Sequence, residues 1–262
     1  MPVYVGGRPA ELDAFTALCD RYGLFLIGDG AQAVGSEYAG KAIGQYGIAT
    51  SISCQNSKNL TCGEGGIILT DNDELHDRIE QILRLGKSDD GSYGTVGLND
   101  GMSEWQAAIL NTQLPGLTEQ ITRRMENAAY LDNALSQLPF VSTLKRDARI
   151  TRNSYHLYLL SLHEDRLNGI SRQTFLDALN AEGIPIAPGY APVYDFPCLS
   201  NSYTQKCIGG AINTTPDTPV ADYLAKHEGC WFYHAVLLGD RRDMEDIVDG
   251  FVKVYENMDE LR

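Results

Sequence analysis

The stretch "SCQNSKNLTCGEGG" (residues 53–66) places one lysine, Lys58, among small and polar residues. Apolar, strand-like runs flank it on both sides, "IATSIS" at 48–53 and "GGIILT" at 65–70. Burying an unpaired ammonium group is costly, so a lysine between two core strands needs a reason. Lys58 is therefore either a solvated loop residue or a lysine kept for chemistry.

A strand upstream of this loop points to an α/β fold. "PAELDAFTALCDRY" (9–22) has the apolar spacing of a helix, and the short apolar run "LFLIGD" (24–29) follows it. We expect this run to be a buried parallel strand that delivers Asp29 at its carboxyl end. Helix followed by strand is the unit of α/β folds, in which ligands bind outside the carboxyl ends of the strands.

The remaining patterns indicate two domains. The expected elements are helices at 73–85, 103–115, 117–138, 171–183 and about 240–259, a strand at 155–162, and an irregular loop at 183–198. The pattern of apolar and polar residues changes near residue 140, where long helical patterns give way to a mixture of helical and strand patterns. We therefore expect a larger α/β domain over residues 1–138 and a smaller α+β domain over 139–262.

Composition excludes several classes of function. The 262 residues carry a formal net charge of -14, which repels a phosphate backbone and disfavours nucleic-acid binding. No apolar run approaches the roughly 20 residues that span a bilayer, so we expect no membrane segment. The N-terminus has no basic segment followed by a long apolar one, so it does not read as a signal peptide.

The six cysteines predict free thiols in a reducing cytosol rather than disulfides. None forms a CxxC pair, and their spacing matches no zinc site, so no metal is expected. Cys54 and Cys62 flank the lysine loop, which invites a redox role. Simple packing of these two side chains is the favoured interpretation.

Asp29 and Lys58 together indicate a function that neither residue indicates alone. Taken alone, an aspartate after a strand is more often a turn residue, and a loop lysine is more often solvated. Together they suit pyridoxal phosphate, because a lysine that forms a Schiff base with it needs a desolvated, neutral amine. The pyridine nitrogen of that cofactor needs a carboxylate beside it, so that the ring can take up electrons.

The sequence resembles the DegT–DnrJ–StrS aminotransferases, a family of pyridoxal-phosphate enzymes. The blocks that carry the resemblance are "GDGAQAVGSEYAGKAIGQYG" (28–47), "SISCQNSKNLTCGEGGIILT" (51–70), "GLNDGMSEWQAAILNTQL" (97–114), "YHLY" (155–158), "EGIPIAPGYAPVY" (182–194) and "LLGD" (237–240). A lysine followed by Asn-Leu and then Gly-Glu-Gly-Gly is the family's cofactor-lysine signature. The resemblance implies the type I, aspartate aminotransferase-like fold, without its N-terminal portion.

The resemblance also implies roles for individual residues. Lys58 resembles the Schiff-base lysine and proton shuttle, and Asp29 resembles the partner of the pyridinium nitrogen. Gln32 resembles the group near the ring oxygen, and Ser53 resembles a ligand of the phosphate. Asn99 resembles the residue that reaches the phosphate of the neighbouring subunit in a homodimer. Without the resemblance, Ser53 and Asn99 would read as plain turn residues.

The implied reaction moves an amino group from glutamine or glutamate to a keto-sugar or a keto-cyclitol. The loop at 182–194 resembles that of enzymes acting on scyllo-inosose-type ketones, which makes such a ketone the candidate substrate. Tyr190 and Tyr194 lie in this loop, and no role is assigned to them. The implied enzyme is a cytoplasmic homodimer.

Departures from the family pattern leave an alternative open. Gly101 stands where the family usually has an arginine, and Cys62 stands in place of a threonine. Family members carry roughly a hundred further residues before the segment that starts here at Met1, as ordinary domain sizes also imply. We therefore expect this chain alone to bind the cofactor poorly. The alternative function is a truncated, catalytically deficient relative that acts as partner subunit of a full-length enzyme.

Overall fold

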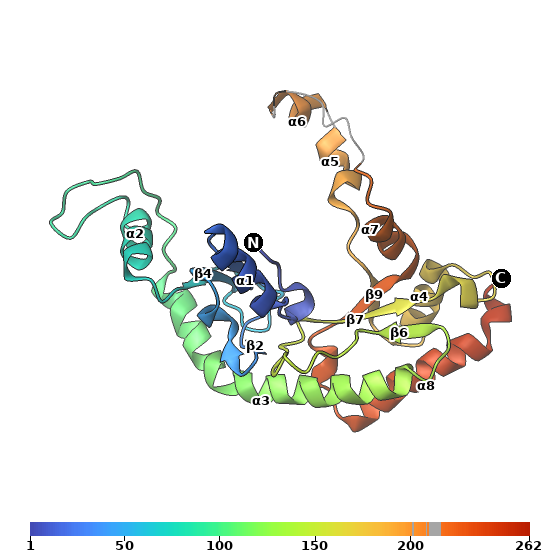
Figure 1. Ribbon diagram of the computed structural model, residues 1–262. Helices are drawn as coiled ribbons and strands as arrows, with labels where there is room; N and C mark the ends of the chain where they lie inside the picture. The colour runs from blue at the N-terminus through green and yellow to red at the C-terminus, as the bar shows by residue number, and fades with distance from the viewer. Residues whose placement is uncertain (201, 208, 210–215) are drawn as a thin grey trace. The chain divides into compact units, whose positions relative to one another are not determined.

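The computed structural model describes residues 1–200, 202–207, 209 and 216–262 (Figure 1). The chain divides into two units: the first is Met1–Glu126 with Arg146–Leu157, and the second is Asn127–Lys145 with Tyr158–Arg262. The segment 146–157 thus belongs to the first unit, whereas the division expected from the sequence at residue 138 assigns it to the second domain.

The described elements are a mixture of helices and strands. The strands are β1 (Ile27–Asp29), β2 (Glu37–Tyr38), β3 (Lys41–Ala42), β4 (Ala49–Ser53), β5 (Gly66–Leu69), β6 (Val141–Thr143), β7 (Leu157–Leu162), β8 (Ile186–Pro188) and β9 (Gly229–Tyr233). The helices are α1 (Leu12–Tyr22), α2 (Asp73–Leu83), α3 (Glu104–Leu135), α4 (Arg172–Ala181), α5 (Pro197–Ser200), α6 (Ser202–Cys207), α7 (Pro219–Tyr223) and α8 (Arg241–Glu256).

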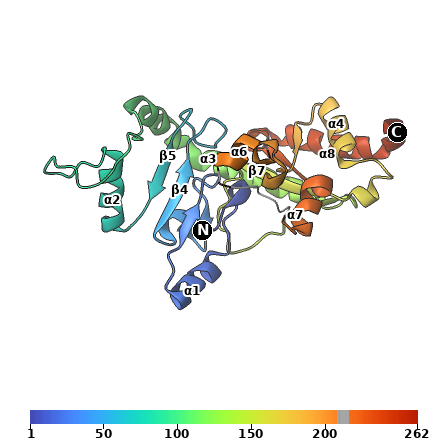
Figure 2. The ribbon, with the colours of Figure 1, turned by 90° about the horizontal axis from the view of Figure 1, so that it is seen from above.

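The first unit is built on a mixed sheet in the order β1-β4-β5. β1 and β4 are parallel, with Asp29 opposite Ser51, and Val3 forms a parallel bridge to Asp29. β4 and β5 are antiparallel, and Ser53 faces Gly66 where the loop between them begins and ends. Figure 2 shows these two strands side by side. The parallel pairing brings the carboxyl ends of β1 and β4 to the same edge of the sheet.

Local sequence signals set the limits of the helices around this sheet. α1 ends at Gly23, which adopts the left-handed conformation (φ 63°) that glycine takes without steric cost. α2 begins after Asn72, whose side chain accepts a hydrogen bond from the amide of Leu75. The core of this unit is a buried cluster of Tyr4, Leu12, Ala33, Tyr38, Ile43 and Ile52.

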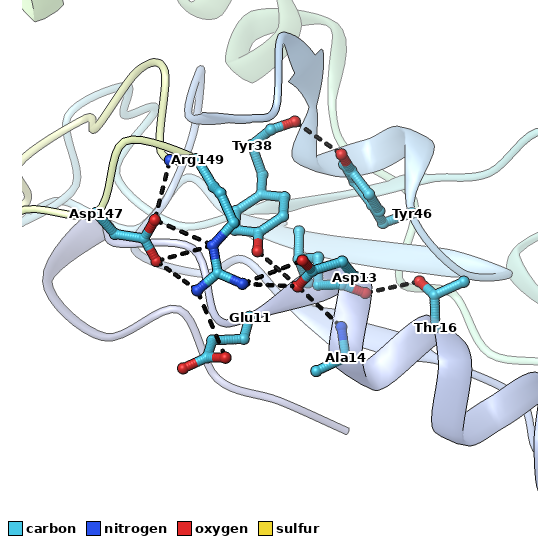
Figure 3. A network of polar contacts seen from close by, with 9 residues as sticks. Glu11, Asp13, Ala14, Thr16, Tyr38, Tyr46, Asp147 and Arg149 are labelled. Carbon is cyan, nitrogen blue, oxygen red and sulfur yellow. Dashed lines mark hydrogen bonds and ion pairs between the residues drawn. The ribbon is translucent and has the colours of Figure 1, made fainter.

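An ionic cluster on the first unit ties the segment around Arg149 to α1 (Figure 3). The guanidinium of Arg149 lies 2.7 Å from Asp147, 3.0 Å from Asp13 and 3.5 Å from Glu11. The hydroxyl of Tyr38 donates to Asp13 at 2.6 Å, and the Arg149 guanidinium stacks over the Tyr38 ring. Hydrogen bonds from Arg149 lower the pKa of Asp147 to about 2. The cluster therefore links residues that are far apart in the sequence.

α3 is one continuous helix, which corrects the expectation of two helices separated at Pro115. It begins with a capping box: the side chain of Ser103 accepts from the amide of Gln106 at 3.4 Å, and the side chain of Gln106 accepts from the amide of Ser103 at 2.9 Å. Pro115 removes one N–H from the interior, so the carbonyl of Asn111 loses its usual helical partner. The helix continues because its remaining turns and its apolar contacts outweigh that single loss.

The second unit packs α4 and α8 with a sheet in the order β6-β7-β9-β8. Ser171 caps α4 through the amide of Thr174, and Asp240 caps α8 through the amides of Arg242 and Asp243. Phe175 and Phe251 are fully buried in this unit. β8 lies inside the loop expected to be irregular at 183–198, because pairing with β9 orders its backbone.

No helix among the described residues is both long enough and apolar enough to cross a membrane.

Candidate active site

Asp29 is the last residue of β1, as the sequence predicts. Its amide donates to the carbonyl of Pro2 at 2.9 Å, and its carbonyl accepts from the amide of Tyr4 at 2.9 Å. One carboxylate oxygen, Oδ1, accepts from the amide of Ala31 at 3.1 Å, which fixes the side chain at the strand end. Backbone hydrogen bonds to Pro2 and Tyr4, in the N-terminal segment of the chain, thus hold Asp29 in place.

Tyr4 and Gly28 pack directly behind Asp29. A side chain on Gly28 would overlap the Tyr4 hydroxyl and would lie 2.8 Å from Oγ1 of Thr50, so only glycine fits there. Burial, reinforced by the charge of Asp29, raises the pKa of Tyr4 to about 12. Tyr4 is therefore a neutral phenol next to the carboxylate.

Ser53 ends β4 and opens the loop that carries Lys58. The Ser53 hydroxyl accepts a hydrogen bond from the amide of Gln55 at 3.3 Å, and the amide of Lys58 donates to the carbonyl of Gln55 at 2.9 Å. Lys58 is half-buried, and its Nζ has no hydrogen-bond or ion-pair partner among the described residues. The loop thus holds its backbone in a turn and leaves the amine of Lys58 unengaged.

Asn59 anchors the loop immediately beside Lys58. Its side chain is buried and donates to the carbonyl of Ser154 at 2.8 Å. Its Oδ1 lies 3.2 Å from Nδ1 of His156, in position to accept a hydrogen bond from it. His156 is also buried, so these contacts hold the loop against residues almost a hundred positions away. The position of Lys58 is therefore set by its neighbour rather than by its own side chain.

Gln32 joins the same network from the segment after β1. Its Oε1 accepts from the amide of Gly6 at 2.7 Å, and its carbonyl accepts from the Ser154 hydroxyl at 3.3 Å. Gly7 adopts φ +94°, and a side chain there would lie 2.5 Å from Oγ of Ser154. The close approach of the backbone at Gly7 requires glycine. Ser154 therefore contacts both the segment that carries Gln32 and Asn59, which anchors the loop with Lys58.

Asn99 stands apart from the other four predicted residues. It lies in the connection between α2 and α3 and is exposed. Its side chain makes no hydrogen bond with Asp29, Gln32, Ser53 or Lys58. Its expected role, contact with the phosphate of a neighbouring subunit, stays a prediction.

The network contains residues to which the sequence interpretation gave no role. These are Asn59, Ser154 and His156, and each contributes a buried polar contact. One signal for Asn59 was present, since it lies between Lys58 and a buried leucine in the signature block. His156 lies in the block "YHLY" (155–158), which gave it no individual role, and Ser154 carried no signal, because its partners are distant in the sequence.

The mixed sheet and the groups at its strand ends define a class: the α/β proteins with the type I aminotransferase fold. 3-amino-5-hydroxybenzoic acid (AHBA) synthase superposes with a TM-score of 0.81 at 26% identity, over 97% of this chain and 67% of that one. An aminotransferase from Psychrobacter cryohalolentis shares the fold with a TM-score of 0.84 at 23% identity, over 98% of this chain and 68% of that one.

The chain belongs to the DegT/DnrJ/EryC1/StrS aminotransferase family, whose sequence profile matches residues 1–218. The L-glutamine:2-deoxy-scyllo-inosose aminotransferase of Streptomyces paromomycinus is 36% identical over 278 residues, covering 97% of this chain and 64% of the relative. The enzyme of the same name from Streptoalloteichus tenebrarius is 34% identical, covering 99% of this chain and 65% of the relative. The chain thus spans about 65% of the length of such relatives.

The described side chains fit the chemistry of pyridoxal phosphate. The amine of Lys58 has no hydrogen-bond or ion-pair partner among the described residues and is suited to the cofactor's aldehyde carbon. The second oxygen of Asp29 has no partner among the described residues and suits a protonated ring nitrogen. Among the described residues, the hydroxyl of Ser53 accepts only from the amide of Gln55, so its proton remains available to a phosphate oxygen.

Proposed function

We propose that this chain carries the cofactor-binding lysine of an aminotransferase that moves an amino group from L-glutamine to a keto-cyclitol. The observation that carries the proposal is the unengaged amine of Lys58, in a loop anchored by Asn59 at the sheet edge where Asp29 and Ser53 end their strands. Nζ of Lys58 is not one of the fully buried side-chain atoms without a partner among the described residues, so it is open to an incoming cofactor.

Each residue has a separate task in this proposal. Pyridoxal phosphate, when bound, supplies the electron sink for the reaction at the carbon that carries the amine. Lys58 binds the cofactor covalently and moves a proton between the two carbons that exchange the amine. Asp29 keeps a proton on the ring nitrogen, and the Ser53 hydroxyl donates to the phosphate. Gln32 would lie near the ring oxygen, with its side chain held by the hydrogen bond that it accepts from the amide of Gly6.

The substrate class is proposed from the family relatives. The enzymes from S. paromomycinus and S. tenebrarius are named for L-glutamine and 2-deoxy-scyllo-inosose. These names support glutamine as the donor and a six-membered cyclic polyol ketone as the acceptor. The loop at 182–194 also supports this choice, since its sequence resembles that of enzymes acting on such ketones.

A second copy of the chain is the proposed partner. Asn99 is exposed, and two large apolar side chains near it in the sequence, Val96 (90% exposed) and Trp105 (83% exposed), are mostly uncovered. A neighbouring subunit would cover these groups and place its phosphate within reach of Asn99. Light scattering at increasing protein concentration tests this part of the proposal.

The test of the reaction follows one nitrogen atom. Because this chain alone is expected to bind the cofactor poorly, the protein is incubated with a large excess of pyridoxal phosphate. L-glutamine labelled with heavy nitrogen at its α-amino group and 2-deoxy-scyllo-inosose are then added. The proposal expects a labelled amino-cyclitol in the mass spectrum, and it expects Asp29→Asn to lower its rate of formation by at least roughly a hundredfold. Absence of labelled product with every keto-cyclitol and keto-sugar tried would refute the proposal.

A further inference from the structure

Two cysteines meet at the base of the lysine loop. Cys54 is the first residue after β4, and Cys62 lies beyond Lys58 on the returning side of the loop. The amide of Cys62 donates to the carbonyl of Cys54 at 3.0 Å. With standard bond lengths, this contact keeps the two Cα atoms within about 7 Å of each other. Disulfides join Cα atoms roughly 4.4–6.8 Å apart, so the backbone is already near the required separation.

The two side chains also converge on the same position. The Sγ of Cys62 lies 3.8 Å from the carbonyl oxygen of Cys54. A side chain built on Gly65 would lie 2.9 Å from that Sγ and 3.7 Å from Cβ of Cys54. Both cysteine side chains therefore border the small space that the glycine leaves free.

Their surroundings differ in a way that suits stepwise oxidation. Cys54 is fully buried in an apolar cluster with Leu60 and Leu110, and Cys62 is half-exposed at the edge of that cluster. Burial raises the pKa of the Cys54 thiol, and the nearby Cys62 adds to this rise. Cys62 is therefore the thiol that a small oxidant reaches first, and Cys54 is the group that reacts second.

We propose that Cys54 and Cys62 form a reversible disulfide across the base of the Lys58 loop when the chain meets a low-molecular-weight disulfide such as oxidised glutathione. The Cys62 thiolate attacks the small disulfide, forms a mixed disulfide and releases one thiol. The Cys54 thiolate then attacks the Cys62 sulfur and releases the second thiol. Two protein thiols lose two electrons and two protons, which reduce the small disulfide to two thiols.

The bond would act on the loop that holds Lys58. Residues 54–62 would become a closed ring, which restricts opening of the loop around the lysine. Trypsin cuts after Lys58 only when the loop opens to fit the protease. Since such cleavage follows the population of the open form, native proteolysis at Lys58 should slow by at least roughly tenfold in the oxidised protein.

Trypsin also supplies the direct assay on the unfolded protein. Cleavage at Lys41, Lys58 and Arg78 separates Cys54, in the peptide 42–58, from Cys62, in the peptide 59–78. The protein is equilibrated with oxidised and reduced glutathione, alkylated in denaturant, digested and measured by mass spectrometry. The proposal expects one linked pair, 42–58 with 59–78, which disappears after treatment with dithiothreitol.

Two variants make the result specific. Cys62→Ser should abolish the linked pair and the protection of Lys58 from trypsin, while Cys198→Ser, a change at an exposed cysteine in α5, should keep both. Glutathione that stays attached to Cys62 while Cys54 remains open to alkylation would refute the proposal. Linked peptides that join other cysteines in equal amount would also refute it. Neither readout needs bound cofactor or enzymatic activity.

Discussion

Asn59 is the residue whose replacement tests the anchored loop most sharply. Its buried side chain donates to the carbonyl of Ser154 at 2.8 Å and lies 3.2 Å from Nδ1 of His156. Asn59→Ala removes both contacts and adds none. Among the described residues, the carbonyl of Ser154 has no other donor, so it would become a buried acceptor without a partner.

The magnitude follows from these two contacts. A buried carbonyl left without a partner costs about 1–3 kcal/mol, and the lost bond to His156 adds about 1 kcal/mol. We therefore expect Asn59→Ala to lower the free energy of unfolding by about 2–4 kcal/mol. Asn56→Ala is the matched control, since Asn56 lies in the same loop and is exposed, and its side chain hydrogen-bonds only to the side chain of Gln55 among the described residues.

Urea unfolding followed by circular dichroism measures both variants. Asn56→Ala should change the free energy of unfolding by less than about 0.5 kcal/mol, as exposed substitutions usually do. A loss of less than about 0.5 kcal/mol for Asn59→Ala as well would refute the account of the anchor. An equal loss for both variants would show that the loop is held by its backbone turn and not by Asn59.

Two further predictions concern the first unit. Gly7→Ala should destabilise the protein by about 1–3 kcal/mol more than Gly40→Ala in thermal unfolding. The reason is that a Cβ on Gly7 meets Ser154, whereas a Cβ on Gly40 meets no described atom within 4 Å. Equal losses of stability in the two variants would contradict this. Hydrogen bonds from Arg149 lower the pKa of Asp147 to about 2, so the stability that Asp147 contributes is present above its ordinary pKa and is lost as the pH falls through about 2. Urea midpoints between pH 5 and pH 2 should therefore fall more steeply in the wild type than in Asp147→Asn, and parallel slopes would contradict this.

Much of the first unit could be predicted from the sequence because its signals are local. The apolar runs around Lys58 became β4 and β5. Only the end of the run before Asp29 became β1, and the expectation of a buried strand was wrong for Phe25 and Ile27, which are exposed. The antiparallel direction of β5 could not be predicted, since strand direction depends on which neighbour it meets. α3 was expected to stop at Pro115, but contacts along a long helix outweigh one missing hydrogen bond.

In the site, too, residues with local sequence signals could be predicted, whereas contacts between residues distant in the sequence could not. Asp29 and Ser53 were predicted at strand ends, and the structure places both there. The anchor at Asn59 was not predicted, because Ser154 and His156 are distant in the sequence and the block "YHLY" (155–158) does not show which residue His156 contacts. The meeting of Cys54 and Cys62 also required the structure, since flanking positions in a loop do not by themselves imply contact.

The most direct test of the central claim is to locate the lysine that binds pyridoxal phosphate. The protein is incubated with the cofactor, reduced with borohydride and digested with trypsin, which does not cut after a modified lysine. We predict that the label lies on the peptide 42–78, which contains Lys58 uncut, and that Lys58→Ala abolishes it while Lys87→Ala, at an exposed position, does not. A label spread over Lys41, Lys87 and the other lysines, or one that persists in Lys58→Ala, would contradict the account.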